Sequence, residues 1–240
     1  HGTLSRADLE GAYEYIRRHP EVWEVILTGG DPLILSPDRL RAIVTTLAGI
    51  DHVGVVRVHT RVPVVAPERI TEALVAALSA ETPVWVVLHC NHRQELGPAA
   101  VVAVRRLAGA GIPLLSQTVL LKGVNDSAEV LEELFRALVR LRVKPYYLHQ
   151  ADLAPGTGHF RTTIAAGQEI VRRLRGPVSG LCQPTYVLDL PGGHGKVPIA
   201  ASQIAQDADG YLVTAPDGTV HRYAPRHVLA APPPDEGSAP

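Results

Sequence analysis

The sequence contains no methionine, only two cysteines, and no uninterrupted apolar run of the roughly 18 residues that a membrane-spanning helix needs. Two cysteines, Cys90 and Cys182, are too few for a disulfide framework and indicate a reducing compartment. The formal net charge is −1, which gives no overall signal for nucleic acid or for an anionic membrane surface. We therefore expect a cytoplasmic protein that binds neither nucleic acid nor membrane.

The composition that remains is that of a globular protein, with 46% hydrophobic and 20% charged residues. A length of 240 residues suffices for one large α/β domain or two small ones. Because the chain begins at His1 without a methionine, we expect that it is a fragment and that residues upstream are missing.

Short apolar runs alternate with amphipathic segments along most of the chain. We expect strands at 22–27, 53–58, 84–88, 113–121 and 143–148, and helices at 5–20, 36–47, 67–78, 98–110, 126–141 and 162–174. Asp126 is the expected cap of the fifth helix, and Asp217-Gly218 the turn of a hairpin over 211–223. The alternation predicts a parallel sheet that is buried on both faces and is closed as a barrel or left open.

Polar residues or glycines follow each of the five predicted strands. They are Gly29, Gly30 and Asp31; His59, Thr60 and Arg61; His89, Asn91 and His92; Gln117; and His149, Gln150 and Asp152. Ligands of α/β proteins bind at the carboxyl ends of parallel strands, so these groups predict a site at that edge of the sheet.

A glycine-rich loop at 188–198, with the sequence LDLPGGHGKVP, follows a further β-rich run. Its spacing fails the phosphate-binding Walker pattern, because Leu190 stands at the first glycine position and Val197 follows the lysine. It also fails the dinucleotide pattern, because Pro198 replaces the third glycine. What remains is Lys196 on a flexible loop seven residues after Asp189: either an exposed turn, or a lysine that binds phosphate or acts as an amine nucleophile.

The other polar groups each have two interpretations. Gly29-Gly30-Asp31 is typical of a turn and equally of a cofactor loop. His89 and His92 have a spacing seen in metal sites, but a third ligand is lacking, so we expect no metal site in this chain. Asp152 and Asp189 are either caps and turn residues or an acidic pocket for a cation.

Taken together, the motifs resemble the lysine 2,3-aminomutase family of radical S-adenosylmethionine (SAM) enzymes, over roughly residues 5–198. The resemblance depends on VILTGGD at 25–31, RVPVV at 61–65, HCNH at 89–92, QTVLLKGVND at 117–126, KPYY at 144–147, HFRT at 159–162, SG at 179–180 and PGGHGK at 191–196. It implies a partial (β/α)6 barrel that lacks its first strand in this chain, followed by a small C-terminal β extension.

The resemblance also implies a role for each candidate residue. Lys196 matches the lysine that binds pyridoxal 5′-phosphate (PLP), and Asp152 and Asp189 match the pair that holds the substrate's side-chain ammonium. Gly29, Gly30 and Asp31 match the motif that receives the amine of SAM. His89 and Gln117 match polar residues that face SAM or PLP.

The chain departs from the family pattern at the iron–sulfur site. The three cysteines, spaced Cys-x3-Cys-x2-Cys, that hold the 4Fe–4S cluster have no counterpart here, and the alignment places them upstream of His1. We expect residues 1–180 to form the barrel without its N-terminal part, 181–229 to carry the PLP loop and the β extension, and 230–240 to be a disordered tail.

The implied activity is conversion of L-lysine to L-β-lysine by a SAM-derived 5′-deoxyadenosyl radical, with PLP carrying the migrating amine. The implied partners are L-lysine, a second copy of the chain, and an electron donor such as flavodoxin or ferredoxin. Two alternatives stay open: an aminomutase of the elongation factor P β-lysylation type, and a non-catalytic PLP-binding remnant. Without its cluster segment the chain is expected to be inactive.

Overall fold

A computed structural model describes residues 4–207 and 210–223. The α-helices are α1 (Arg6–Arg18), α2 (Pro37–Ala48), α3 (Val62–Val65), α4 (Glu72–Ala77), α5 (Pro98–Gly109), α6 (Ala128–Arg140) and α7 (Ile164–Leu174). The strands are β1 (Glu24–Leu27), β2 (Val55–Thr60), β3 (Val84–His89), β4 (Leu114–Leu120), β5 (Val143–Gln150), β6 (Thr185–Asp189), β7 (Lys196–Pro198), β8 (Ile204–Asp207), β9 (Gly210–Thr214) and β10 (Val220–Tyr223).

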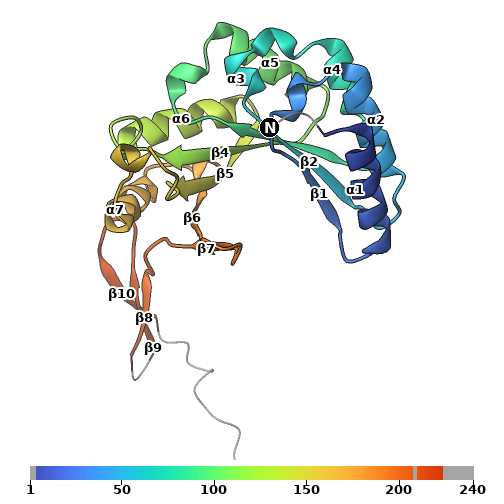
Figure 1. The fold of residues 1–240 in the computed structure, drawn as a ribbon. Coiled ribbons are helices and arrows are strands. Elements are labelled where there is room, and N and C mark those ends of the chain that lie inside the picture. The colour runs from blue at the N-terminus through green and yellow to red at the C-terminus, as the bar shows by residue number, and fades with distance from the viewer. Residues whose placement is uncertain (1–3, 208–209, 224–240) are drawn as a thin grey trace, which may run out of the picture. The chain divides into compact units, whose positions relative to one another are not determined.

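The first compact unit, residues 1–200, contains a curled seven-stranded sheet in the order β1 to β7. Neighbouring strands from β1 to β6 are parallel, and β7 is antiparallel to β6. Figure 1 shows the helices along the convex outer side of this sheet, which leaves the concave side open. The predicted partial barrel is confirmed.

The core lies between the sheet and its helices because alternate strand residues face the two sides. In β4, Leu114, Ser116, Thr118 and Leu120 are buried beneath the helices, while the residues between them are half-buried on the concave side. Amphipathic helices supply the other half of the core; α6, for example, buries Leu131, Leu134, Phe135 and Leu138. The convex side is therefore packed, and the concave side is left for function.

The helix ends follow local capping chemistry. Ser5 forms a capping box with Asp8 at the start of α1, and Ser36 caps α2, with Pro37 in its first turn. The predicted Asp126 cap of α6 is wrong: the Ser127 side chain accepts the hydrogen bond from the Val130 amide instead. The helix expected at 67–78 is shorter, because a 3-10 turn at Pro67–Arg69 precedes α4.

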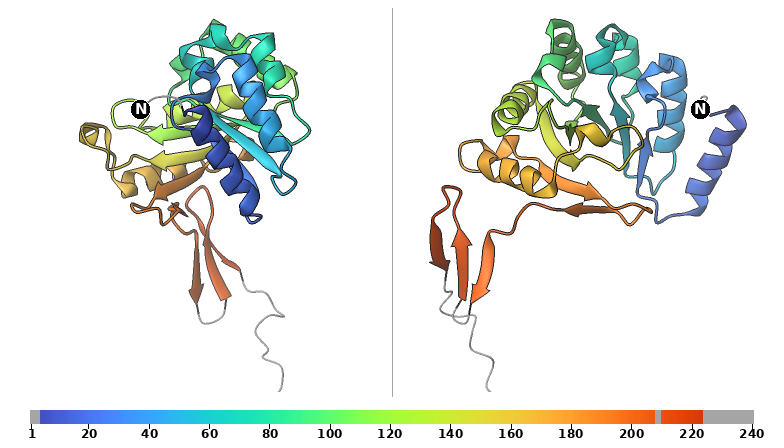
Figure 2. Two further views of the ribbon diagram at one scale, coloured as in Figure 1. Left: turned by 45° about the vertical axis from the view of Figure 1, so that its right-hand side comes forward. Right: turned by 60° about the vertical axis from the view of Figure 1, so that its left-hand side comes forward.

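The second compact unit, residues 201–240, contains the antiparallel sheet β10–β9–β8 within its described residues. The predicted hairpin is confirmed, since β9 pairs with β10 and Gly218 adopts a positive φ of 88° in the turn. The views of Figure 2 show these three strands as one small sheet. The expected tail at 230–240 lies outside the described residues. The boundary between the two compact units lies between residues 200 and 201. Strands β6 and β7 pair within the barrel sheet. The expected segment at 181–229, with the PLP loop and the β extension, stays a prediction.

Candidate active site

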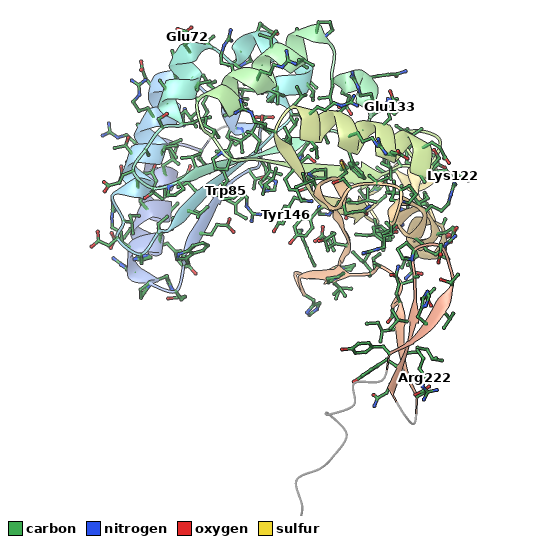
Figure 3. All side chains as sticks on the ribbon, turned by 180° about the vertical axis from the view of Figure 1, so that it is seen from behind. Glu72, Trp85, Lys122, Glu133, Tyr146 and Arg222 are labelled. Carbon is green, nitrogen blue, oxygen red and sulfur yellow. The ribbon has the colours of Figure 1, made fainter. Side chains whose placement is uncertain are left out.

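The concave face carries a row of polar side chains, one from almost every strand. Residues in register on neighbouring strands point to the same side, and His89 is paired with Gln117, Gln117 with Tyr147, and Asp189 with Lys196. Figure 3 shows Trp85 and Tyr146 on this concave side, opposite the helices that carry Glu72 and Glu133. The sheet thus gathers on one surface residues that are far apart in the sequence.

Lys196 and Asp189 form an ion pair across the β6–β7 hairpin. Lys196 Nζ lies 2.5 Å from Asp189 Oδ1. The turn between the strands is made by Gly192, Gly193 and Gly195, which all have positive φ, and it is closed by the Leu190 amide on the Gly195 carbonyl. The glycines therefore fold the chain back so that the lysine lies opposite the aspartate.

The second oxygen of Asp189 is held by His149. His149 Nδ1 lies 3.0 Å from Asp189 Oδ2, and the imidazole is buried, with 5% of its side chain exposed. Burial alone would raise the pKa of Asp189, but the hydrogen bonds and charges of Lys196 and His149 hold it below its ordinary value. The carboxylate is thus ionised near neutral pH and accepts a hydrogen bond from each neighbour.

The imidazole of His149 is neutral at the same pH, since burial lowers its pKa although Asp189 opposes this effect. An ionised carboxylate can only accept, so His149 carries its proton on Nδ1 and leaves Nε2 as an acceptor. Nε2 is buried and has no hydrogen-bond partner among the residues described. The site therefore offers a hydrogen-bond acceptor to a bound ligand.

A histidine pair lies further along the concave face. His59 Nδ1 is 3.1 Å from His89 Nε2, and the rings meet edge to face with centroids 5.2 Å apart. Burial, followed by the charge of His89, lowers the pKa of His59 to about 4, and burial also lowers that of His89. The charge of Lys196 acts on His59 as well, which shows that the pair lies within electrostatic reach of the lysine.

The Gly29-Gly30-Asp31 motif follows β1 directly, and its aspartate makes several contacts inside the chain. Oδ1 of Asp31 accepts from the Leu33 amide, and the two oxygens accept from the Thr60 hydroxyl and the Arg61 amide. Asp31 thus fixes the end of β1 to the end of β2. Gly29 has a φ of 104° and open space around it, so the backbone here is accessible to a ligand.

The structure places the remaining candidate residues as follows. Gln117 lies half-buried on the concave face beside His89. Asp152 is exposed just after β5, and its charge acts on His149, which contacts Asp189. The charges of both aspartates predicted to hold an ammonium therefore act on the same histidine. His92 instead caps the short helix at Arg93–Glu95.

His59 and His149 were identified in the sequence as polar strand-end residues, but no role was assigned to them. The pair Arg57–Glu24 was missed altogether; Arg57 Nη2 lies 2.9 Å from Glu24 Oε2 on the concave face. Strand alternation was the available signal, because Arg57 and His59 alternate with buried Val56 and Val58.

An apolar cleft of about 500 Å³ runs along α1, the free edge of β1 and α2, and the Gly29-Gly30-Asp31 motif is part of its lining. Besides that motif, the polar side chains of its lining are those of Tyr13, Thr28 and Arg39. Residues 4–207 and 210–223 contain no group of three or more metal-ligating side chains and no helix long and apolar enough to cross a membrane.

Solved structures are similar to this chain in their fold alone. Streptococcus suis SuiB, solved with S-adenosylmethionine bound, superposes with a TM-score of 0.55 at 11% identity, over 79% of this chain and 45% of SuiB. The same enzyme with its precursor peptide SuiA gives a TM-score of 0.53 at 13% identity, over 76% of this chain and 42% of that one. The fold is that of the radical SAM enzymes, a partial β/α barrel with helices outside.

Sequence comparison narrows this class. The chain is 44% identical to L-lysine 2,3-aminomutase of Clostridium subterminale, over 90% of this chain and 52% of that enzyme. It is 46% identical to a putative L-lysine 2,3-aminomutase of Aquifex aeolicus (83% and 54%), and 39% identical to glutamate 2,3-aminomutase of Clostridioides difficile (87% and 50%). No protein-family model matches the chain.

The chain is similar over most of its length to the lysine 2,3-aminomutase family, as its motifs led us to expect. It spans about half the length of the curated relatives that it matches. The family includes a lysine and a glutamate enzyme, so the substrate has to be argued from the site.

Proposed function

We propose that the protein containing this chain is a lysine 2,3-aminomutase, which converts L-lysine to L-β-lysine with PLP and SAM. The observation that supports this most is the pairing of Lys196 with Asp189 on the concave face of a radical SAM barrel. Bound PLP would carry the migrating amine, and SAM with an iron–sulfur cluster would supply the radical that removes hydrogen from an unactivated carbon.

The residues around Lys196 fit PLP. Lys196 has 42% of its side chain exposed, so its amine is accessible to an aldehyde. Nothing lies within 4 Å of where a Cβ on Gly193 or Gly195 would be, which leaves room for the cofactor beside the loop. Buried imidazole nitrogens of His59 and His149, without partners among the described residues, provide polar contacts for a ligand.

SAM is assigned to the opposite part of the same face, at Gly29, Gly30, Asp31, His89 and Gln117. The backbone at Gly29 and Gly30 has open space around it, which suits the close approach of a ligand's amine. The charge of Asp31 acts on His89, so the two predicted SAM contacts lie near each other. This assignment rests on that proximity and on the family resemblance.

The described thiols do not fit an iron–sulfur cluster. Cys90 and Cys182 have 0% and 5% of their surface exposed and lie in the hydrophobic core. Burial raises the pKa of Cys90 to about 12, whereas cluster ligands must be thiolates. We therefore assign no cluster ligand to this chain.

The acidic residues favour lysine over glutamate as substrate. Asp189 and Asp152 would pair the ε-ammonium of lysine, which is costly to bury unpaired, and would repel the side-chain carboxylate of glutamate. The elongation factor P type of enzyme and the non-catalytic remnant remain alternatives. The homo-oligomeric state, the external electron donor and the cytoplasmic location also remain predictions.

Covalent capture of PLP tests the assignment of Lys196. Lysine occurs only at positions 122, 144 and 196, so a reduced adduct can be located by peptide mass spectrometry. After incubation with PLP and borohydride we expect the label on Lys196 and its loss in Lys196→Ala. Lys122→Ala, which removes an exposed lysine, is the matched control and should keep the label.

The half-buried Lys144 provides a stringent check on this result. Its Nζ donates to the carbonyls of Pro145 and Gln183, and burial lowers its pKa, which makes it the strongest competing nucleophile. A label on Lys144, or one spread over all three lysines and unchanged in Lys196→Ala, would rule out the PLP site.

A further inference from the structure

Two cations compete for Asp189: the ammonium of Lys196 and the side-chain ammonium of the proposed substrate. The structure shows the first of these in place, with 2.5 Å between Lys196 Nζ and Asp189 Oδ1. We propose that Lys196 occupies the substrate's ammonium subsite in the free protein, and that His149 holds Asp189 in the position both cations need. This inference rests on the proposed function and specifies which group occupies the substrate site before the substrate binds.

The contact between Lys196 and Asp189 is built into the sheet. The two residues are directly opposite in the antiparallel β6–β7 pair, where side chains on one face are nearest neighbours. Two further pairs, Leu188 with Val197 and Val187 with Pro198, fix this register. A long, flexible lysine side chain is thereby kept beside the carboxylate.

Both oxygens of Asp189 already have a hydrogen-bond partner. Oδ1 is taken by Lys196 and Oδ2 by the His149 Nδ1 proton. An incoming ammonium therefore competes with Lys196 for Oδ1, because two ammonium groups at one carboxylate repel each other. The charge of Asp152 acts on His149. Asp152 makes no contact with Lys196 among those described for the chain, so it can pair with the ammonium of an incoming substrate.

His149 is a positioning residue in this arrangement. It reaches Asp189 from the neighbouring strand β5, and the buried ring stacks edge to face on Tyr147, with centroids 5.6 Å apart. A ring held on one side by Tyr147 and on the other by the carboxylate cannot turn freely. His149 therefore keeps the carboxylate from rotating and directs Oδ1 towards the cation.

The competition can be measured without any cofactor, in the full-length protein. Lys196→Met removes the internal cation, while Lys196→Arg keeps a positive charge at the same place. L-Lysine is the probe, and L-norleucine, which has the same carbon chain without the ε-ammonium, is the matched ligand. Titration calorimetry should give a Kd for L-lysine on the order of tenfold lower in Lys196→Met than in Lys196→Arg.

Two controls assign the gain to Asp189 and to His149. Adding Asp189→Asn to Lys196→Met should abolish the tenfold gain, as a double-mutant cycle requires. In the Lys196→Met background, His149→Leu should lose most of the gain, whereas His149→Asn, which keeps an N–H donor near Nδ1, should retain it. L-Norleucine should bind all variants alike.

Equal affinity of L-lysine for the Met and Arg variants, no binding to either, or an equal gain for L-norleucine would each overturn the proposal. Equal behaviour of His149→Leu and His149→Asn would remove the positioning role. These outcomes are separate from a failure of the proposed function, which the PLP labelling of wild-type Lys196 measures on its own.

Discussion

Full-length protein carrying Asp189→Asn is expected to turn over L-lysine with a kcat/KM about 10²–10³ times below that of the wild type. The substitution keeps the shape of the side chain and removes the charge that pairs the substrate's ammonium. Stranding one partner of a desolvated ion pair costs about 3–5 kcal/mol, and each 1.4 kcal/mol is about tenfold in rate. With 33% of its side chain exposed, Asp189 belongs at the lower end of that range.

Asp152→Asn is expected to lower kcat/KM for L-lysine in the same direction, because Asp152 is the second predicted carboxylate. In the cofactor-free protein the two variants should differ in their affinity for L-lysine, because Lys196 is paired with Asp189 and has no described contact with Asp152. Asp38→Asn is the matched control: Asp38 lies in the first turn of α2 with 96% of its side chain exposed, and its loss should leave turnover unchanged. Steady-state kinetics on the reconstituted enzyme measures all three. Normal turnover in both Asp189→Asn and Asp152→Asn would remove the case for a cationic substrate.

Asn125→Leu is expected to lower the free energy of unfolding by about 3–5 kcal/mol, because three partly buried backbone groups would lose their partner. Asn125 is completely buried; its Oδ1 accepts from the Leu121 amide, and its Nδ2 donates to the carbonyls of Asn91 and Val119. Leucine has a similar volume and can replace none of these bonds. Asn125 thus connects the loops after β3 and β4, at the carboxyl edge of the barrel.

Urea denaturation of the full-length protein measures this effect, with Asp126→Leu as the matched control. Asp126 is the next residue and is exposed, so the same leucine there should change the free energy of unfolding by about 0.5 kcal/mol or less. A change below about 1 kcal/mol in Asn125→Leu would show that water or a rearranged loop satisfies the three groups.

The order of strands and helices could be predicted because each element carries its own periodicity and end signals. Ser36 with Pro37, for instance, marks the start of α2 without any tertiary information. The error at Asp126 has a local cause, since Asp126 and Ser127 are adjacent and both are good capping residues. The helix expected at 67–78 begins late because Thr71, and not Pro67, caps α4.

The residues of the candidate site could be predicted from the sequence, whereas most of the contacts between them could not. The motifs indicated Lys196 and Asp189 separately, but their ion pair depends on the pairing of β6 with β7, which seven residues of sequence spacing do not specify. The role of His149 depends on the neighbouring strand, 40 residues away from Asp189. Asp31 was expected to face a ligand, and its hydrogen bonds to Leu33, Thr60 and Arg61 emerge only from the packing of strand ends.

The most direct test of the proposed function is the fate of the amine in the full-length protein under anaerobic, reducing conditions. L-Lysine labelled with heavy nitrogen in its α-amine should give L-β-lysine with the label on carbon 3, detected by mass spectrometry. This product should require both SAM and PLP, and L-glutamate should give no β-glutamate. Formation of β-glutamate from L-glutamate, or no β-lysine from a protein loaded with cluster, SAM and PLP, would contradict the assignment as a lysine 2,3-aminomutase.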